Sequence, residues 1–120
     1  MDDQLKLLMD YTIFHLGVYI TLLSVLVGFA EKGVHLSRRS RGIAIFCFLI
    51  AGMAGGTIAG NIPLYASWAN FERAAFGPYR LEITSFFWWA AVEHTAFWIG
   101  VISDVLPVVW HAAFGRRRAG

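Results

Sequence analysis

Four ionisable residues lie inside apolar stretches, and these are the residues of the chain that could do chemistry. Glu93 and His94 stand side by side in FFWWAAVEHTAFWI, which is otherwise apolar and aromatic apart from one threonine. Asp104 follows Glu93 by eleven residues, almost three whole helical turns, so a helix would place both carboxylates on one face about 16 Å apart. His15 is the single ionisable residue of another apolar run. Together they predict a proton, ion or cofactor site within a membrane, where ionisable residues are usually functional.

The depth of these residues is comparable if the aromatic residues Tyr11 and Trp89 mark the same membrane boundary. His15 then lies four residues below its boundary, and Glu93 and His94 lie four and five residues below theirs. Three chemistries are open. The two histidines could ligate the iron of haem b, a His, His, Glu set could hold a divalent metal, or the acids and histidines could pass protons or small ions. The alternative is structural, with Glu93 kept protonated by desolvation or hydrogen-bonded to a polar group of a neighbouring subunit, and with His15 a packing residue.

The composition places these residues in a bilayer. The 120 residues are 58% hydrophobic and 16% aromatic, and only 15% are charged, against about 25% in soluble domains. A soluble domain of this size could not bury so much apolar surface. Nucleic acid is excluded as a partner, because the basic residues gather in two clusters beside apolar segments, 32–41 and 116–118, which is typical of membrane-flanking charge.

Two apolar runs in the first half predict spanning helices. Residues 11–30 and residues 42–60 both have the length that crosses about 30 Å of hydrocarbon. The connection that follows the second run is too polar to cross, but its aromatic residues suit the headgroup region. We expect a short helix lying along the interface at residues 64–75.

The third apolar run is longer than one upright span. Either residues 83–106 cross, with the helix kinked or ended at Pro107, or the tryptophans at its two ends place the span at residues 89–110. The sequence therefore predicts a single all-α membrane domain, residues 1–120, with three transmembrane helices and a short interfacial helix between the second and third.

Charges outside the runs predict the orientation. The first tail is acidic, while the first connection and the last tail are basic. Because Lys and Arg concentrate on the cytoplasmic side, we expect an N-terminus outside and a cytoplasmic C-terminus, in a bacterial inner membrane. No basic leader precedes the first run, so we expect it to remain uncleaved. Cys47 is the only cysteine, which rules out an internal disulfide.

Small residues mark one side of the second predicted span. Small residues let helix backbones approach closely, and such contact drives helix association in lipid. The stripe predicts packing within the chain, a seam between chains, or a groove for a flat cofactor or quinone. It comprises Gly52, Gly55, Gly56, Ala59 and Gly60.

The sequence ranks three functions. The first is an accessory subunit or homo-oligomer that packs through this glycine-rich face. The second is proton or small-ion transport along the stripe of Glu93 and Asp104. The third is an electron-transfer subunit associated with haem b or quinone through His15 and His94. A thin bundle of three spans favours association with itself or a larger membrane complex, and no motif of a soluble enzyme is present, so we expect no catalytic activity by itself.

Overall fold

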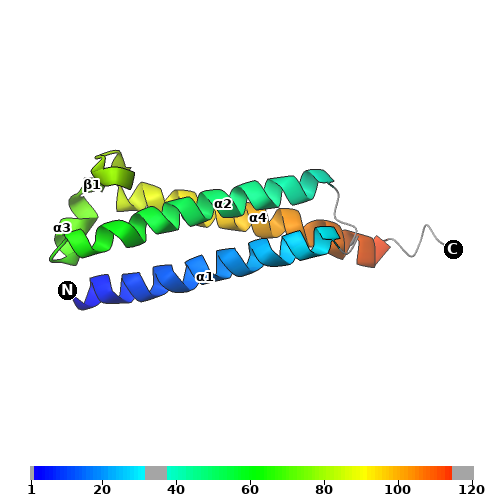
Figure 1. Cartoon of the computed structure of the whole chain (residues 1–120), viewed down its shortest axis with the longest axis horizontal. Helices are drawn as coiled ribbons and strands as arrows, with labels where there is room; N and C mark the ends of the chain where they lie inside the picture. Colours follow the sequence, from blue (N-terminus) through cyan, green and yellow to red (C-terminus); the bar gives the residue numbers. More distant parts are fainter. Residues whose placement is uncertain (1, 32–37, 115–120) are drawn as a thin grey trace.

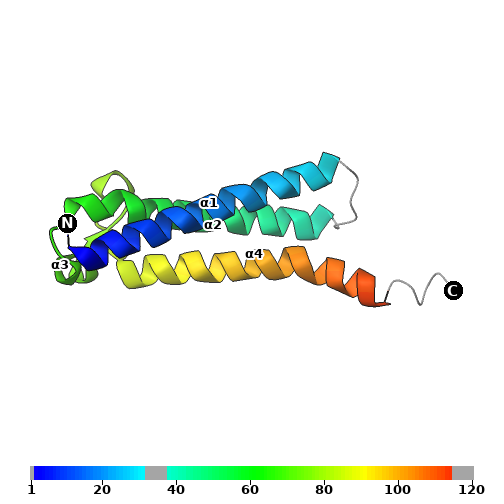
Figure 2. The same ribbon diagram turned by 90° about the horizontal axis from the view of Figure 1, so that it is seen from below.

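The computed structural model describes residues 2–31 and 38–114 and shows three long helices bundled together. They are α1 (Asp3–Glu31), α2 (Arg38–Asn61) and α4 (Phe86–Phe114). Figures 1 and 2 show them side by side along the long axis, with α2 running opposite to α1 and α4. Each is long and apolar enough to cross a membrane. The predicted all-helical fold with three candidate spanning helices is confirmed, and it indicates an integral membrane protein.

The outer two helices extend beyond the predicted spans. α1 begins eight residues before residue 11, because that stretch contains good helix formers such as Gln, Lys and Leu. The backbone N–H of Gln4 donates to Asp2 Oδ1 at 2.7 Å, which satisfies one free donor at the start of the helix. α4 continues through Pro107 to Phe114. Its 29 residues rise about 43 Å, which exceeds a hydrocarbon layer of about 30 Å.

Between α2 and α4 the chain folds into a small cap at one end of the bundle (Figure 1). The predicted interfacial helix is present but shorter than residues 64–75. α3 (Trp68–Arg73) begins after Ser67, whose side chain accepts the N–H of Asn70. The cap also holds a two-residue antiparallel strand pair that was not predicted. Its remaining elements are the 3₁₀ turns Ile62–Leu64 and Pro78–Arg80 and the strands β1 (Ala75–Phe76) and β2 (Thr84–Ser85).

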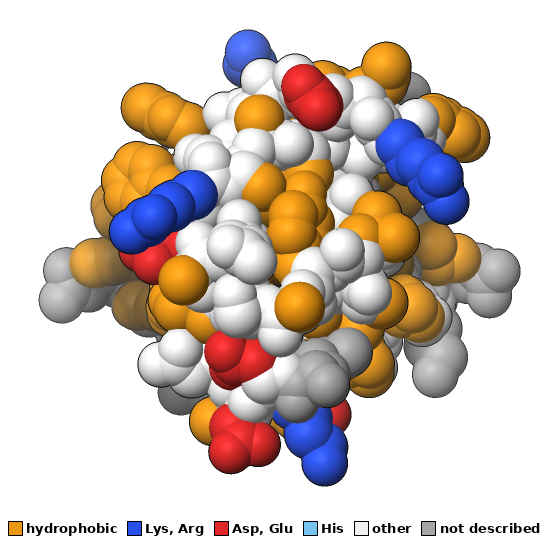
Figure 3. Space-filling model, turned by 90° about the vertical axis from the view of Figure 1, so that its left-hand side faces the viewer, with side chains coloured by type: hydrophobic (Ala, Val, Ile, Leu, Met, Phe, Trp, Pro, Cys, Tyr) orange, Lys and Arg blue, Asp and Glu red, His pale blue; other side chains and the backbone are white. Residues whose placement is uncertain are grey.

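An apolar cluster fastens this cap to the helices. It joins the start of α1, the end of α2 and the cap through buried Leu5, Ile58, Ile62, Phe71 and Phe76. Above it, exposed charged residues of both signs occupy the end of the molecule (Figure 3). This is the surface expected where a membrane protein meets water. The charged residues include Lys6, Glu72, Arg73, Arg80 and Glu82.

The core of the bundle is narrow and follows α2, which packs against both other long helices. Two buried clusters lie along it, one centred on Phe48 and the other on Tyr19. Most large apolar side chains of α1 and α4 remain exposed. In a bilayer, lipid chains or other helices cover them, which fits the membrane assignment.

Candidate functional site

Glu93 lies where the three long helices meet. Its side chain is only 3% exposed, and the hydroxyl of Tyr19 on α1 donates to its Oε1 at 2.7 Å. Gly55 on α2 closes the third side. A Cβ on Gly55 would lie 3.3 Å from both Glu93 Oε1 and Leu16 Cδ2, tighter than an ordinary contact. The missing side chain of Gly55 is therefore what gives the acid its space.

Tyr19 is the only hydrogen-bond partner of the Glu93 side chain in the described part of the chain. Tyr19 is itself buried, with 1% of its surface exposed. A buried polar group without a hydrogen bond costs about 1–3 kcal/mol, so an acid in this buried place depends on its bond to Tyr19. The pair forms a polar link between α1 and α4 inside an apolar bundle.

His15 and His94 face each other on the side of the bundle between α1 and α4. Their ring centres are 6.3 Å apart. His15 is half-buried against Tyr11, whose ring centre is 4.0 Å away, and His94 is exposed. The structure thus brings together the three residues for which a common depth was predicted. Glu93, however, turns inward to Tyr19 rather than toward the two histidines.

Each histidine is fixed by a hydrogen bond to its own helix. His15 Nδ1 lies 2.8 Å from the carbonyl oxygen of Tyr11, and His94 Nδ1 lies 2.8 Å from that of Ala90. A carbonyl oxygen only accepts, so Nδ1 carries the proton in both rings. In neutral rings this leaves each Nε2 with a lone pair, and neither Nε2 has a protein partner among the described residues.

Asp104 shares the predicted face with Glu93 but not its contacts. It is half-buried on α4, three turns beyond Glu93. Between the two acids, Gly100 is covered by Phe48: a Cβ on this glycine would lie 2.8 Å from Phe48 Cε1. Phe97 lies in the same layer. The two carboxylates of one chain are therefore separated by packed aromatic rings.

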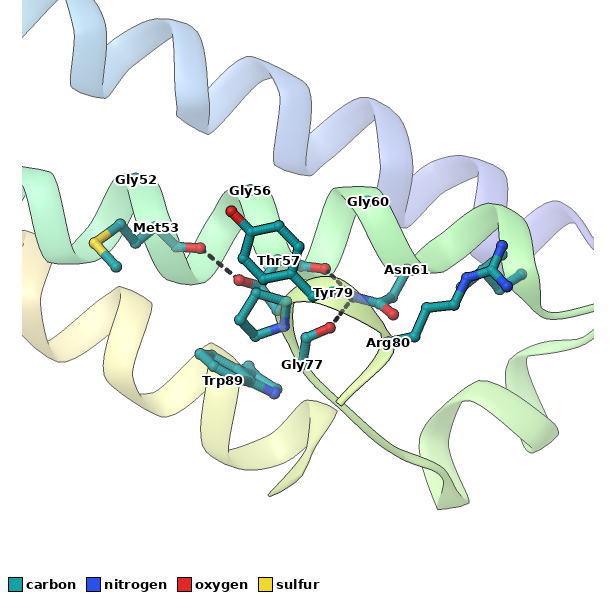
Figure 4. A pocket seen from close by; sticks show the side chains of 12 residues that line it. Gly52, Met53, Gly56, Thr57, Gly60, Asn61, Gly77, Tyr79, Arg80 and Trp89 are labelled. Atoms are coloured by element: carbon teal, nitrogen blue, oxygen red, sulfur yellow. Dashed lines mark hydrogen bonds between the residues drawn. The ribbon is translucent and has the colours of Figure 1, made fainter. Parts of the chain in front are cut away.

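The glycine stripe of α2 divides between an inner and an outer side. Gly55 is buried against Glu93, whereas a Cβ added at Gly52, Gly56 or Gly60 would meet nothing within 4 Å. These three glycines form the floor of a groove of about 700 Å³ (Figure 4). Ala59 is half-buried beside them. Most of the stripe is thus unused by packing within the chain.

The cap overhangs one end of this groove. Asn61 Nδ2 donates to the carbonyl oxygens of Thr57 and Gly77, at 2.7 and 3.2 Å, and ties the overhanging loop to α2. Tyr79 and Arg80 follow with φ of 57° and 64°, a left-handed backbone that costs side-chain-bearing residues energy. Figure 4 shows Tyr79 projecting from this loop and Trp89 from α4.

Sequence reasoning missed the partner of the buried acid and the overhanging loop. The position of Tyr19, one helical turn after His15 on the same face, was a usable signal for the first. Nothing in the sequence signals the left-handed turn at Tyr79, since neither residue there is glycine. The basic residue Lys32, His35 and the cluster 116–118 lie outside the described residues.

No group of three or more His, Cys, Asp or Glu side chains in residues 2–31 and 38–114 is arranged to hold a metal ion. The predicted His, His, Glu set is thus not assembled there, and the two histidines form a pair. Comparison of the chain with protein-family models, with curated proteins and with solved structures finds no match.

Proposed function

We propose that the protein is a membrane subunit that associates with a second copy of itself through the outer glycine face of α2. The observation that carries this proposal is that a Cβ added at Gly52, Gly56 or Gly60 would meet no atom of the described chain within 4 Å. Three glycines at four-residue spacing form a flat strip along one side of a helix. In lipid, such a strip lets another helix approach closely enough for van der Waals contact, which drives association there.

A second copy is the occupant we favour because the strip is self-complementary. When the same face meets itself across a two-fold axis, each glycine strip lies against the other. Right-handed helix pairs in membranes commonly use this arrangement, with crossing angles near about −40°. The overhanging loop would then border the seam at one end of the groove.

The test is the mass of the detergent-solubilised protein. Wild type should be a dimer or larger, and Gly56→Leu should be monomeric, because leucine fills the strip. Gly17→Leu is the matched control, since Gly17 is an exposed glycine of α1 that also has open space where a Cβ would stand. If both variants keep the wild-type mass, the strip is not the seam. If wild type is monomeric but loses another membrane protein on Gly56→Leu, the partner is a different chain and the protein is an accessory subunit.

The orientation is part of the same proposal. The capped end joins the acidic first tail to the charge-balanced connection between α2 and α4, whereas the basic residues Arg39 and Arg41 stand at the start of α2, at the opposite end (Figure 1). Basic residues stay on the cytoplasmic side. We place the cap and the N-terminus outside and the C-terminus in the cytoplasm of a bacterial inner membrane.

Proton or small-ion transport is the second hypothesis, and the buried position of Glu93 is the observation that favours it. In one chain, a route from Glu93 to Asp104 would cross the layer of Phe48 and Phe97. A path would therefore need surfaces contributed by a second chain. Proton flux into liposomes that is the same for wild type and Glu93→Gln would remove Glu93 from any such mechanism.

A further inference from the structure

The two histidines on the face between α1 and α4 are used neither by the glycine seam nor by the buried acid. We propose that His15 and His94 bind one haem, each giving its Nε2 to the iron from opposite sides. The inference does not rest on the α2 seam, because the two features lie on different sides of the bundle. Each can fail without the other.

The separation of the two rings supports coordination on opposite sides of one metal. With metal–nitrogen bonds of about 2 Å and ring centres about 1.1 Å beyond each nitrogen, two opposed imidazoles have centres about 6.3 Å apart, whereas a tetrahedral angle brings them to about 5 Å. The observed separation of His15 and His94 is 6.3 Å. The distance between the ring centres of His15 and His94 therefore fits the opposed arrangement, which haem iron offers, better than the tetrahedral one.

The protonation of the rings also suits metal binding. Metal-bound histidines usually donate the other ring N–H to a carbonyl or carboxylate, which fixes the tautomer and makes the ligating nitrogen more basic. Here the Nδ1–H groups of His15 and His94 donate to the carbonyl oxygens of Tyr11 and Ala90, both at 2.8 Å. Neutral imidazoles held in this way present Nε2 as the only ligating atom.

The surroundings of the pair differ on the two helices. His15 is held between Tyr11 and Tyr19, with ring centres 4.0 and 6.2 Å away, so its orientation is set before any ligand binds. His94 is exposed, and its hydrogen bond to the carbonyl oxygen of Ala90 orients its ring. Phe14 and Trp98 nearby on the two helices are also exposed, and they offer apolar surface for the rim of a macrocycle.

Glu93 is not a ligand in the proposed haem site. Its side chain turns into the bundle and accepts the hydroxyl of Tyr19, while His94 points to the face between α1 and α4. The proposed protein ligands are therefore two histidines without a carboxylate. No third His, Cys, Asp or Glu joins the pair in residues 2–31 and 38–114, and the four nitrogens of a porphyrin would fill the remaining positions of the iron.

The test is a titration of the full purified chain in detergent with ferric haem, followed by visible absorption and electron paramagnetic resonance. Wild type should bind one haem per chain and show the low-spin signature of iron with two nitrogen ligands. His15→Ala and His94→Ala should each give a high-spin, five-coordinate spectrum, and added imidazole should restore the low-spin form. The double variant should lose saturable binding. His111→Ala, at the second histidine of α4, is the matched control and should behave as wild type.

Three results would overturn the proposal. If the double variant binds haem with the wild-type spectrum, haem is merely partitioning into detergent. If wild type gives only a high-spin spectrum, the two histidines do not act together. The third result would come from a parallel titration with Cu²⁺ or Zn²⁺. If one of these ions binds through both histidines and haem does not bind, the pair is a site for a simple metal ion and not for haem. Helix content measured by circular dichroism confirms that each variant is folded.

Discussion

The bond between Tyr19 and Glu93 gives the sharpest prediction on stability. Tyr19→Phe removes the hydroxyl that donates at 2.7 Å and leaves the buried carboxyl group of Glu93 without its hydrogen-bond partner among the described residues. An unsatisfied buried polar group costs about 1–3 kcal/mol, and hydrogen bonds between membrane helices average about 0.6 kcal/mol with a maximum near about 1.7. We expect Tyr19→Phe to lower the free energy of unfolding by about 1–2 kcal/mol, measured by denaturant titration in mixed micelles.

A double-mutant cycle separates the bond from the packing. Glu93→Gln keeps an oxygen that accepts the Tyr19 hydroxyl, so it should cost less than Tyr19→Phe. Glu93→Ala removes the acceptor altogether, so Tyr19→Phe combined with Glu93→Ala should cost less than the sum of these two changes made singly, because the second change removes a bond already lost. Tyr11→Phe is the control on the same helix. Tyr11 is half exposed, and its hydroxyl makes no hydrogen bond within the described residues, so the change should stay within about 0.5 kcal/mol. Equal effects at Tyr11 and Tyr19 would refute the reasoning.

Three further predictions test packing, pH dependence and orientation. Gly100→Ala puts a Cβ 2.8 Å from Phe48 Cε1 and should lower the unfolding free energy by about 1–3 kcal/mol. Gly17→Ala, outside the glycine strip, has open space there and should be neutral or raise the unfolding free energy by up to about 1 kcal/mol, so equal destabilisation in the same titration would contradict the packing. The N–H groups of Trp68 and Gln4 hold the pKa of Asp2 below its usual value. The Asp2 link therefore stabilises the fold above the ordinary carboxyl pKa and is lost as pH falls through the lowered value. The thermal midpoint of wild type should drop across this acid range more than that of Asp2→Asn, and parallel profiles would count against the link. In a Cys47→Ala background, Ala69→Cys on α3 should react with an impermeant thiol reagent in intact cells, whereas Ala119→Cys should react only after lysis; the reverse pattern would invert the orientation.

The spanning helices were predictable because a single quantity, hydropathy over about 20 residues, decides them. Their ends were not. α1 begins at Asp3 because polar helix formers extend it beyond the apolar run, and α4 passes Pro107 because one missing backbone donor does not end a spanning helix. The cap was predicted only as a short helix. Its strand pair is two residues long, and such pairing depends on tertiary contacts that a sequence pattern does not reveal.

The placement of the candidate residues was predictable where helical periodicity sets direction and depth. Periodicity placed Glu93 and Asp104 on one face, and the aromatic boundaries placed His15 level with His94. Periodicity does not fix the rotation of one helix against another, which decides that Tyr19, and not His15, meets the acid. It also does not reveal which glycines of α2 face inward. Gly55 does, and Gly56, one residue later, does not.

The neighbours Glu93 and His94 show how one short stretch serves two surfaces. Consecutive residues on a helix point about 100° apart, so a bundle with three helices can receive one of them in its interior and leave the other on a face. Gly55 and Tyr19 make room for the acid and bond it, which holds α4 at one rotation relative to α1 and α2. That rotation in turn brings His94 to 6.3 Å from His15. If this reasoning holds, Tyr19→Phe should disturb haem binding as well as stability, although Tyr19 touches neither Nε2. A buried polar bond would then be what positions the exposed histidine pair.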